Sequence, residues 1–304
     1  MDSSEVTTLS LCAGYGGLDL GLQRVLPTCR TVAYVEIEAF ACANLVAKME
    51  AGELAPAPIW TNLKSFDGRA FRGRVDILTG GFPCQPFSAA GNRNADDDPR
   101  HLFPDVLRTI RAIQPGWVFL ENVEGLITAK LKGGDWGDVA GTPVLLHVLR
   151  GLERSGYRAT WGIFSAAEVG APHRRNRVFI LAHAHNGGGS QDRQPGELRP
   201  GRTLEPPRDR WPARPGEDQE GWEEPRTSPH GEAQPGLGRA ANGATVRLDR
   251  LRLLGNGVVP AVAARAFATL QGHLTTQDGR SLRDGPLWPL QGVYKLDGCR
   301  CRQE

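Results

Sequence analysis

The chain has 304 residues, of which 40% are hydrophobic and 23% are charged, proportions typical of ordinary soluble proteins. This length allows one sizeable catalytic domain and a smaller module. The formal net charge of +2 is too small to indicate nucleic-acid binding by itself, so such a role must be argued from motifs. No apolar run approaches the about 20 residues that span a bilayer, and the acidic start Met1–Glu5 lacks signal-peptide features, so we expect a cytoplasmic protein.

Short β-rich runs alternate with helical stretches from residue 6 to about residue 184, a pattern typical of a doubly wound α/β sheet. The expected strands are Val6–Leu11, Thr31–Val35, Val75–Leu78, Trp117–Leu120, Tyr157–Ile163 and Arg177–Leu181. The expected helices are Leu18–Val25, Glu38–Met49, Leu102–Ile113 and Val144–Ser155, where apolar residues recur at helical spacing. The pattern predicts a Rossmann-like fold: a mostly parallel twisted sheet with helices on both faces.

Composition changes after this α/β region. In residues 185–245 roughly a third of the residues are Gly or Pro and few are aliphatic, a mixture that cannot bury a normal core. Order is expected again over residues 246–271, where a Gly-Asn-Gly turn leads into a helix at Ala261–Leu270. We therefore divide the chain into a main domain (1–184), a small irregular region (185–245), a segment that returns to the main domain (246–271) and a tail (272–304).

A glycine-rich turn follows the first strand, in the run Cys12–Gly21. Glycines let the backbone approach a ligand closely, and the next helix offers free N–H groups. The dinucleotide pattern GxGxxG fails because Asp19 stands at the third glycine. Glu36, after the second strand, is suited to accept hydrogen bonds from ribose hydroxyls. The pair indicates a nucleoside-type cofactor other than NAD, although a glycine turn or a loop carboxylate taken singly often binds nothing.

Cys84 lies in the run Gly80–Ser88, directly after the third expected strand. This is the carboxyl edge of the sheet, where α/β enzymes keep their sites. A lone cysteine is usually a small buried hydrophobe. Here Pro83 and Pro86 fix the backbone on both sides and a doubled glycine leaves room for a substrate, so the context predicts a nucleophile.

The Cys84 run resembles the signature loop of DNA cytosine-5 methyltransferases, and further motifs follow in that family's order. The glycine turn and Glu36 resemble its first two motifs. Glu121-Asn122-Val123 resembles its Glu-Asn-Val, His173–Val178 resembles Gln-x-Arg-x-Arg with His173 in place of Gln, and Gly255–Pro260 resembles its last motif. Asn62-Leu63 departs from the third motif, which usually has Asp, although an amide oxygen can accept the same hydrogen bond.

The resemblance implies methyl transfer from S-adenosylmethionine to carbon 5 of a flipped-out cytosine, with residue roles carried over position by position. The implied catalytic residues are Cys84 as nucleophile, Glu121 at N3 of the ring, and Arg175 and Arg177, which contact the base and order the site. The implied cofactor-binding residues are Cys12, Ala13, Gly14, Gly16, Gly17, Leu18, Glu36, Ile37, Asn62, Leu63, Pro83, Asn256 and Val258. Gln85, Ser88 and Arg93 are the implied DNA-binding residues, in a loop expected to close over the base.

The resemblance also sets expectations about partners. We expect double-stranded DNA as the substrate, a monomer, and a bacterial or phage-encoded enzyme with a cognate restriction endonuclease as a candidate partner. No metal is expected, because Cys299 and Cys301, like His183 and His185, lack the second pair of ligands that a structural zinc site needs.

Three questions stay open at the level of sequence. The region 185–245 is either a reduced target-recognition region, in which Trp211 and Trp222 would stack on bases or contact phosphates, or a linker. A tRNA cytosine-5 methyltransferase would share Cys84 and Glu121. A catalytically inactive accessory protein that binds S-adenosylmethionine or DNA is the third alternative, although the intact Cys84, Glu121 and Arg175 argue against it.

Overall fold

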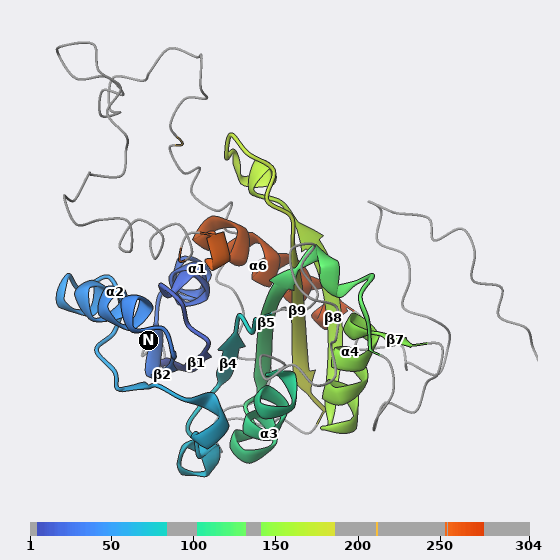
Figure 1. Ribbon diagram of the computed structural model, residues 1–304, viewed down its shortest axis with the longest axis horizontal. Helices are drawn as coiled ribbons and strands as arrows, with labels where there is room; N and C mark the ends of the chain where they lie inside the picture. Colours follow the sequence, from blue (N-terminus) through green and yellow to red (C-terminus); the bar gives the residue numbers. More distant parts are fainter. Residues whose placement is uncertain are drawn as a thin grey trace, which may run out of the picture.

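A seven-stranded sheet forms the centre of the computed structural model, which describes residues 5–83, 102–131, 141–185, 211, 253 and 255–276 (Figure 1). The strand order is β3-β2-β1-β4-β5-β9-β8. Its strands are β1 (Val6–Leu11), β2 (Cys29–Val35), β3 (Ile59–Trp60), β4 (Ile77–Gly80), β5 (Trp117–Val123), β8 (Tyr157–Phe164) and β9 (Arg177–Ala184). A separate two-stranded ladder pairs β6 (Lys130–Leu131) with β7 (Thr142–Pro143).

Four of the six pairings in the large sheet are parallel, and β9 runs antiparallel to both of its neighbours, β5 and β8. The prediction of a mostly parallel sheet is therefore confirmed. The antiparallel strand has a consequence for the site. Because β9 runs against β5, its first residue, Arg177, lies opposite Val123, the last residue of β5.

Helices cover both faces of the sheet (Figure 1). The helices are α1 (Gly17–Val25), α2 (Ala39–Glu50), α3 (Phe103–Ile113), α4 (Val144–Arg154) and α6 (Pro260–Thr276). On one face α1 packs against α6 over Ile77, Phe119 and Phe179. On the other face α3 and α4 cover Leu78, Val118 and Ile180. The predicted arrangement with helices on both faces is thus confirmed.

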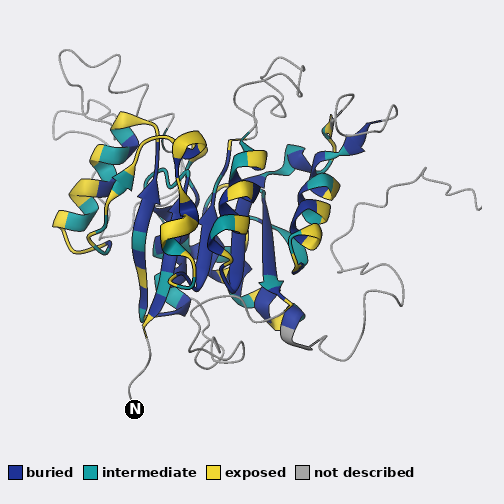
Figure 2. Cartoon of the chain, turned by 90° about the horizontal axis from the view of Figure 1, so that it is seen from below, coloured by how far each residue is buried: buried dark blue, intermediate teal, exposed yellow. Residues whose placement is uncertain are grey.

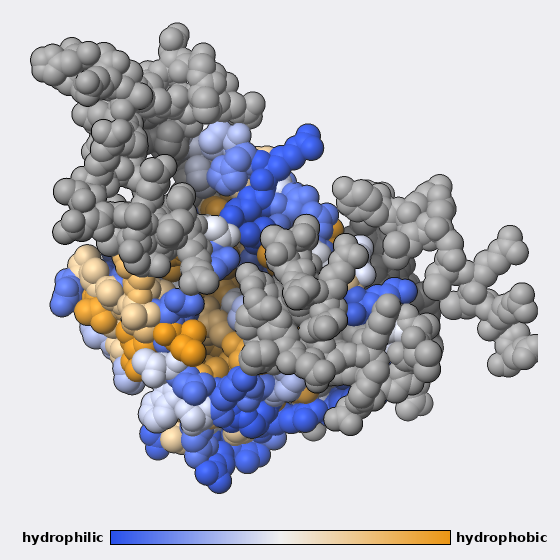
Figure 3. All heavy atoms as spheres, in the orientation of Figure 1, coloured by the Kyte–Doolittle hydropathy of each residue, from blue (hydrophilic) through white to orange (hydrophobic). Residues whose placement is uncertain are grey.

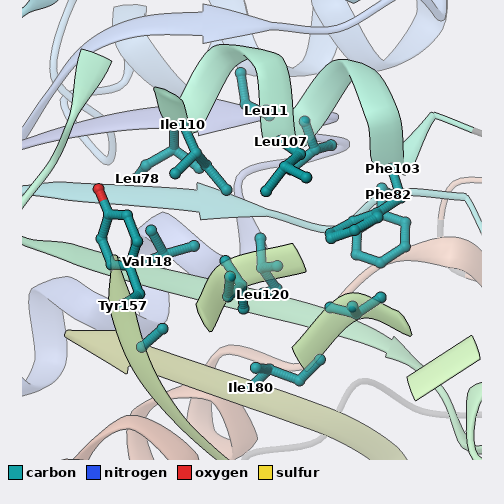
Figure 4. Packing of buried hydrophobic residues seen from close by; sticks show 14 of the residues in the cluster. Leu11, Leu78, Phe82, Phe103, Leu107, Ile110, Val118, Leu120, Tyr157 and Ile180 are labelled. Atoms are coloured by element: carbon teal, nitrogen blue, oxygen red, sulfur yellow. The ribbon is translucent and has the colours of Figure 1, made fainter. Parts of the chain in front are cut away.

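The amphipathic pattern of α3 shows how these helices are held. Phe103, Val106, Leu107, Ile110 and Ile113 recur at the spacing of one helical face, and all five are buried. Figure 4 shows this face of α3 packed over β4 and β5. The strands themselves are buried on both sides, as in β5, where residues 117–122 are all buried, and therefore read as near-continuous apolar runs. Figure 2 shows the same distribution, with exposed residues on the outer sides of the helices.

The expected elements all form, with shifts at their ends. The helix expected at Ala261–Leu270 is longer, at Pro260–Thr276, and the strand expected at Val75–Leu78 runs from Ile77 to Gly80. The edge strand β3 and the small ladder β6–β7 were not predicted, because two-residue strands carry no periodic signal.

Exposed apolar side chains gather around α2, where Figure 3 shows a hydrophobic area. Within the described part of the chain, the large hydrophobic residues that are exposed are Ile37, Val46, Trp60 and Leu146. Val46 lies in α2, Ile37 lies just before it, and Trp60 is the last residue of β3. None of the helices in the described residues is both long and apolar enough to cross a membrane.

Candidate active site and cofactor-binding edge

The carboxyl ends of three parallel strands meet at one edge of the sheet. Leu11, the last residue of β1, pairs with Val35 at the end of β2 and with Gly80 at the end of β4. The segments that follow these strands are therefore neighbours in space. Ligands of open α/β sheets bind at such an edge, and most of the predicted site residues lie there.

The glycine turn after β1 is tied directly to Glu36. The backbone N–H of Gly14 donates to Glu36 Oε2 at 2.7 Å, and the N–H of Glu38 donates to Oε1 at 2.8 Å. Positive φ angles at Cys12, Gly14 and Gly16 turn the chain here. Glu36 is buried, with 7% of its surface exposed. Because a carboxylate can accept about four hydrogen bonds, Glu36 keeps acceptor capacity for a ligand while it braces the turn.

Ile37 presents apolar surface next to this carboxylate. It is 70% exposed, unlike its buried neighbour Glu36, whose backbone N–H is bound to the carbonyl of Trp60 at 2.8 Å. Asn62 is exposed and its Oδ1 accepts from the N–H of Lys64 at 3.0 Å, which caps a short 3-10 helix. Leu63 is buried in the core beneath it. An exposed isoleucine and a carboxylate together suit a ligand with a flat ring and hydroxyl groups.

Glu121 is a buried acid at the end of β5. Only 5% of its surface is exposed, and Arg177 Nε lies 3.0 Å from Glu121 Oε1 in an ion pair. Burial raises the pKa of Glu121 to about 7, against the opposing effect of the Arg177 and Arg175 charges. Near neutral pH the carboxyl group is therefore present in both its protonated and its charged form.

The start of the Cys84 loop passes directly beside this carboxyl group. A Cβ atom added at Gly81 would lie 3.5 Å from Glu121 Oε2. Asn122 donates from Nδ2 to the carbonyl of Phe82 at 3.1 Å, and the Phe82 ring packs on Phe103 with 5.6 Å between centroids (Figure 4). The loop is thus fixed to β5 and α3 up to Pro83, which is exposed. The predicted residues Cys84, Gln85, Ser88 and Arg93 lie outside the described residues.

Arg175 reaches the segment that precedes α6. Its Nη2 atom donates to the carbonyl oxygens of Gly255, at 2.7 Å, and Gly257, at 2.5 Å. Its Nε is buried and has no hydrogen-bond partner among the described residues. In this segment Val258 is buried and Asn256 is exposed. The guanidinium therefore joins the predicted final motif to the edge where Glu121 lies.

Trp211 packs against the α/β domain. Its indole Nε1 donates to the carbonyl of Val169 at 2.9 Å, and its ring meets His173 edge-on with 6.2 Å between centroids. Gly170 leaves room for it. The indole N–H and the contact with His173 thus hold Trp211 against the α/β domain. Trp222 lies outside the described residues.

The described cysteines are poor candidates for a nucleophile. Burial, reinforced by nearby acidic groups, raises the pKa of Cys12 and of Cys29 to about 12, and burial raises the pKa of Cys42 as well. A thiol with such a pKa stays protonated at neutral pH and is unreactive. Within the described ranges no three His, Cys, Asp or Glu side chains are grouped as metal ligands would be.

Two residues at this edge were not assigned a role from the sequence. Tyr15, inside the glycine turn, donates its hydroxyl to the carbonyl of Val258. Asn122 holds the carbonyl of Phe82. Both contacts join residues far apart in the chain, so no local pattern reveals them, although Asn122 stands beside Glu121 in a motif that was recognised.

A sheet of this order, with one antiparallel strand inserted before the edge strand, has the Rossmann-like fold of S-adenosylmethionine-dependent methyltransferases. The family model of C-5 cytosine-specific DNA methylases matches residues 6–198, and the chain belongs to that family. S-adenosylmethionine is the cofactor of these enzymes.

Curated relatives agree with this assignment. The type II methyltransferase M.NgoMIV of Neisseria gonorrhoeae is 34% identical over 182 residues, which cover 59% of this chain and 52% of the relative. The type II methyltransferase M.NaeI of Lentzea aerocolonigenes is 30% identical over 185 residues, covering 60% and 40%. The chain therefore spans about half or less of the length of these relatives. The solved Dnmt2 methyltransferase of S. pombe is 23% identical with a TM-score of 0.45, covering 59% of this chain and 51% of that chain.

Proposed function

We propose that this protein methylates carbon 5 of cytosine in double-stranded DNA, with Cys84 as the nucleophile. The observation that carries the proposal is the buried Glu121, whose pKa is raised to about 7 directly beside Gly81, three residues before Cys84. A carboxyl group kept partly protonated by burial can donate a hydrogen bond at neutral pH, a state that a surface glutamate does not reach.

The residues at the sheet edge fit S-adenosylmethionine. Glu36 is the acceptor for the ribose hydroxyls, the exposed side chain of Ile37 packs against the adenine ring, and the glycine turn before α1 allows close approach of the methionine part. Asn62 faces the adenine amino group in this proposal, with Leu63 beside it. Cys12, Ala13, Gly14, Gly16, Gly17 and Leu18 belong to the turn and the start of α1, Pro83 to the Cys84 loop, and Asn256 and Val258 to the segment before α6. When bound, S-adenosylmethionine supplies an electrophilic methyl group for C5 of the activated ring.

The protein residues must activate the ring, because C5 of cytosine is a poor nucleophile. The Cys84 thiolate adds to C6 and pushes electron density toward C5 and N3. Protonated Glu121 donates to N3 and stabilises the charge that develops there, while Arg177 holds the Glu121 carboxyl group in place. After C5 has been methylated, a water molecule takes the C5 proton, as the family resemblance suggests. The C5–H electron pair then restores the C5=C6 double bond as the C6–S bond breaks and the Cys84 thiolate leaves.

Access to C6 requires the cytosine to leave the helical stack. Flipping a base costs a few kcal/mol, which contacts to the flipped base and the surrounding DNA must offset. Gln85, Ser88 and Arg93 are proposed to contribute such contacts. Because the curated relatives are named type II methyltransferases, we also propose a cognate restriction endonuclease as a partner. If this is right, DNA methylated by the protein should resist cleavage by that endonuclease.

Covalent trapping tests the proposal. Duplex DNA that contains 5-fluorocytosine cannot lose its C5 substituent, so an active enzyme stays attached in the presence of S-adenosylmethionine. We expect a denaturation-resistant adduct with the wild-type protein and none with Cys84→Ser. Tritium transfer to unmethylated genomic DNA and to tRNA, measured side by side, separates a DNA enzyme from an RNA enzyme. Transfer to tRNA alone, or no adduct in either nucleic acid, would refute the proposal.

A further inference from the structure

The segment before α6 is held at three carbonyl groups by side chains from two different parts of the site. Tyr15, from the glycine turn, donates to the carbonyl of Val258. Arg175, from the loop before β9, donates to the carbonyls of Gly255 and Gly257. We call residues 255–259 the returning segment. It is bound on one side by the cofactor turn and on the other by an arginine next to Glu121.

The fit between Tyr15 and the returning segment leaves no space for larger residues. A Cβ atom at Gly257 would overlap the Tyr15 ring, and one at Gly17 would overlap the Val258 carbonyl. The backbone of the returning segment is therefore in direct contact with both the ring of Tyr15 and the first turn of α1. Such close backbone contact is a use of glycine that no other residue permits.

The Tyr15 hydroxyl also lies within the electrostatic reach of the active site. Burial is the main cause of its raised pKa, and the charges of Arg175 and Glu121 both act on it, in opposite directions. Tyr15 thus stands between the residues proposed to bind S-adenosylmethionine and the residues proposed to bind the cytosine. Tyr15 can therefore affect Glu121 and Arg175 without itself reacting.

We propose that Tyr15 is a positioning residue that fixes the returning segment against the glycine turn, and so sets both cofactor affinity and the placement of Arg175. This inference rests on the proposed function, which assigns Val258 to the cofactor pocket and Arg175 to the cytosine site. With the hydroxyl removed, the Val258 carbonyl loses its donor, the returning segment loosens, and Val258 no longer closes the cofactor pocket. Arg175, bound to the same segment, then shifts relative to Glu121.

Tyr15→Phe tests this, because it removes one oxygen and keeps the ring that packs on Gly257. Tyr157→Phe is a matched control: Tyr157 donates its hydroxyl to the carbonyl of Pro115 at 2.8 Å, a bond of the same kind at the start of β8, away from the site. Both variants are measured well below their Tm. We expect S-adenosylhomocysteine to bind Tyr15→Phe about three- to tenfold more weakly than wild type, the usual range for one lost hydrogen bond, and Tyr157→Phe to bind it as wild type does.

Kinetics on unmethylated genomic DNA complete the test. For Tyr15→Phe we expect KM for S-adenosylmethionine to rise and kcat to fall, because one segment serves both subsites, whereas neither changes in Tyr157→Phe. Gly257→Ala, which displaces the same segment by overlap with the ring, should change both parameters in the same direction and further. Equal S-adenosylhomocysteine affinity in the two tyrosine variants would overturn the inference. If the wild-type protein binds S-adenosylhomocysteine but methylates no DNA, the proposed function is wrong. The role of Tyr15 is then assessed from the S-adenosylhomocysteine affinities alone.

Discussion

Two buried carboxyl groups lie under the same sheet edge in opposite surroundings. Asp19, in the first turn of α1, is 1% exposed and accepts hydrogen bonds from the hydroxyls of Ser10, at 2.8 Å, and Thr31, at 2.9 Å. Glu121 is 5% exposed and faces two arginines beside the Cys84 loop. Burial raises the pKa of both, to about 6 and about 7.

The difference is in what surrounds each acid. The hydroxyls around Asp19 form a continuous hydrogen-bonded chain, in which Thr79 donates to Ser10 and Thr31 pairs with Thr8. Three strands and α1 therefore share one polar cluster. Glu121 instead lies two residues before the end of β5, beside Gly81. A raised pKa is therefore not by itself a sign of catalysis. The neighbours of the acid decide whether it supports the fold or serves a substrate.

Glu121→Gln tests the difference between these two acids most directly. The amide keeps the shape of the side chain but cannot supply the acid form, so we expect kcat to fall by about 100- to 1,000-fold, as when one transition-state hydrogen bond is lost. S-adenosylhomocysteine affinity should stay within about twofold, since Glu121 is not among the proposed cofactor residues. Methyl transfer within a few-fold of wild type would show that Glu121 is structural like Asp19.

Asp19→Ala should have the opposite profile. It leaves the hydroxyls of Ser10 and Thr31 without their acceptor in a buried site, so we expect the free energy of unfolding to fall by about 1–3 kcal/mol. The kcat per folded molecule should change little. Urea denaturation and active-site titration measure the two quantities, and a loss of kcat without a loss of stability would contradict the assignment.

The pH dependence of catalysis is a second test of the role of Glu121. The pKa of Glu121 lies near 7, so the acid form, which donates to N3, is lost as the pH rises through that value. We expect single-turnover rates, corrected for Cys84 ionisation, to fall above about pH 7 and to approach a tenfold decrease per pH unit. The same limb in Glu121→Gln would assign it to another group.

Asp19→Asn should change how stability depends on pH. The pKa of Asp19 is raised from 3.8 to about 6 in the folded protein, so the folded state binds the proton more tightly than the unfolded state. The stabilisation is complete below about pH 4 and is lost as the pH rises through about 6. An asparagine can accept from Ser10 and donate to Thr31, so the variant should gain stability relative to wild type over this window. Parallel urea curves at pH 4.5 and 7.5 measure the change, and an unchanged difference would contradict it.

Local patterns were sufficient to predict six of the seven strands of the large sheet and the helices α1, α2, α3, α4 and α6. Leu9 and Leu11 in β1, or Phe103, Val106 and Ile110 in α3, show their burial through periodicity alone. The direction of β9 was not predictable in this way, because an apolar run reads the same in a parallel and an antiparallel strand.

The contacts within the site were less accessible. The order of the motifs brought Glu121 and Arg177 together as candidates, and the structure places them 3.0 Å apart. The bond from Tyr15 to Val258 spans 243 positions, and its existence depends on how α6 lies on α1. Such a contact follows from packing between complete elements, which the spacing of residues within one element does not encode.

The position of α6 bears on when activity can arise during synthesis. This helix contributes Val262, Phe267 and Leu270 to the core on the α1 face, and the residues just before it complete the proposed site. The chain must therefore be synthesised through about residue 276 before this core and the proposed site can form. An incomplete chain that ends after β9 would contain Glu121 and Arg177 but would expose an apolar face of the sheet to water. We therefore expect nascent chains to lack the proposed methyltransferase activity and to depend on chaperones until α6 has been synthesised.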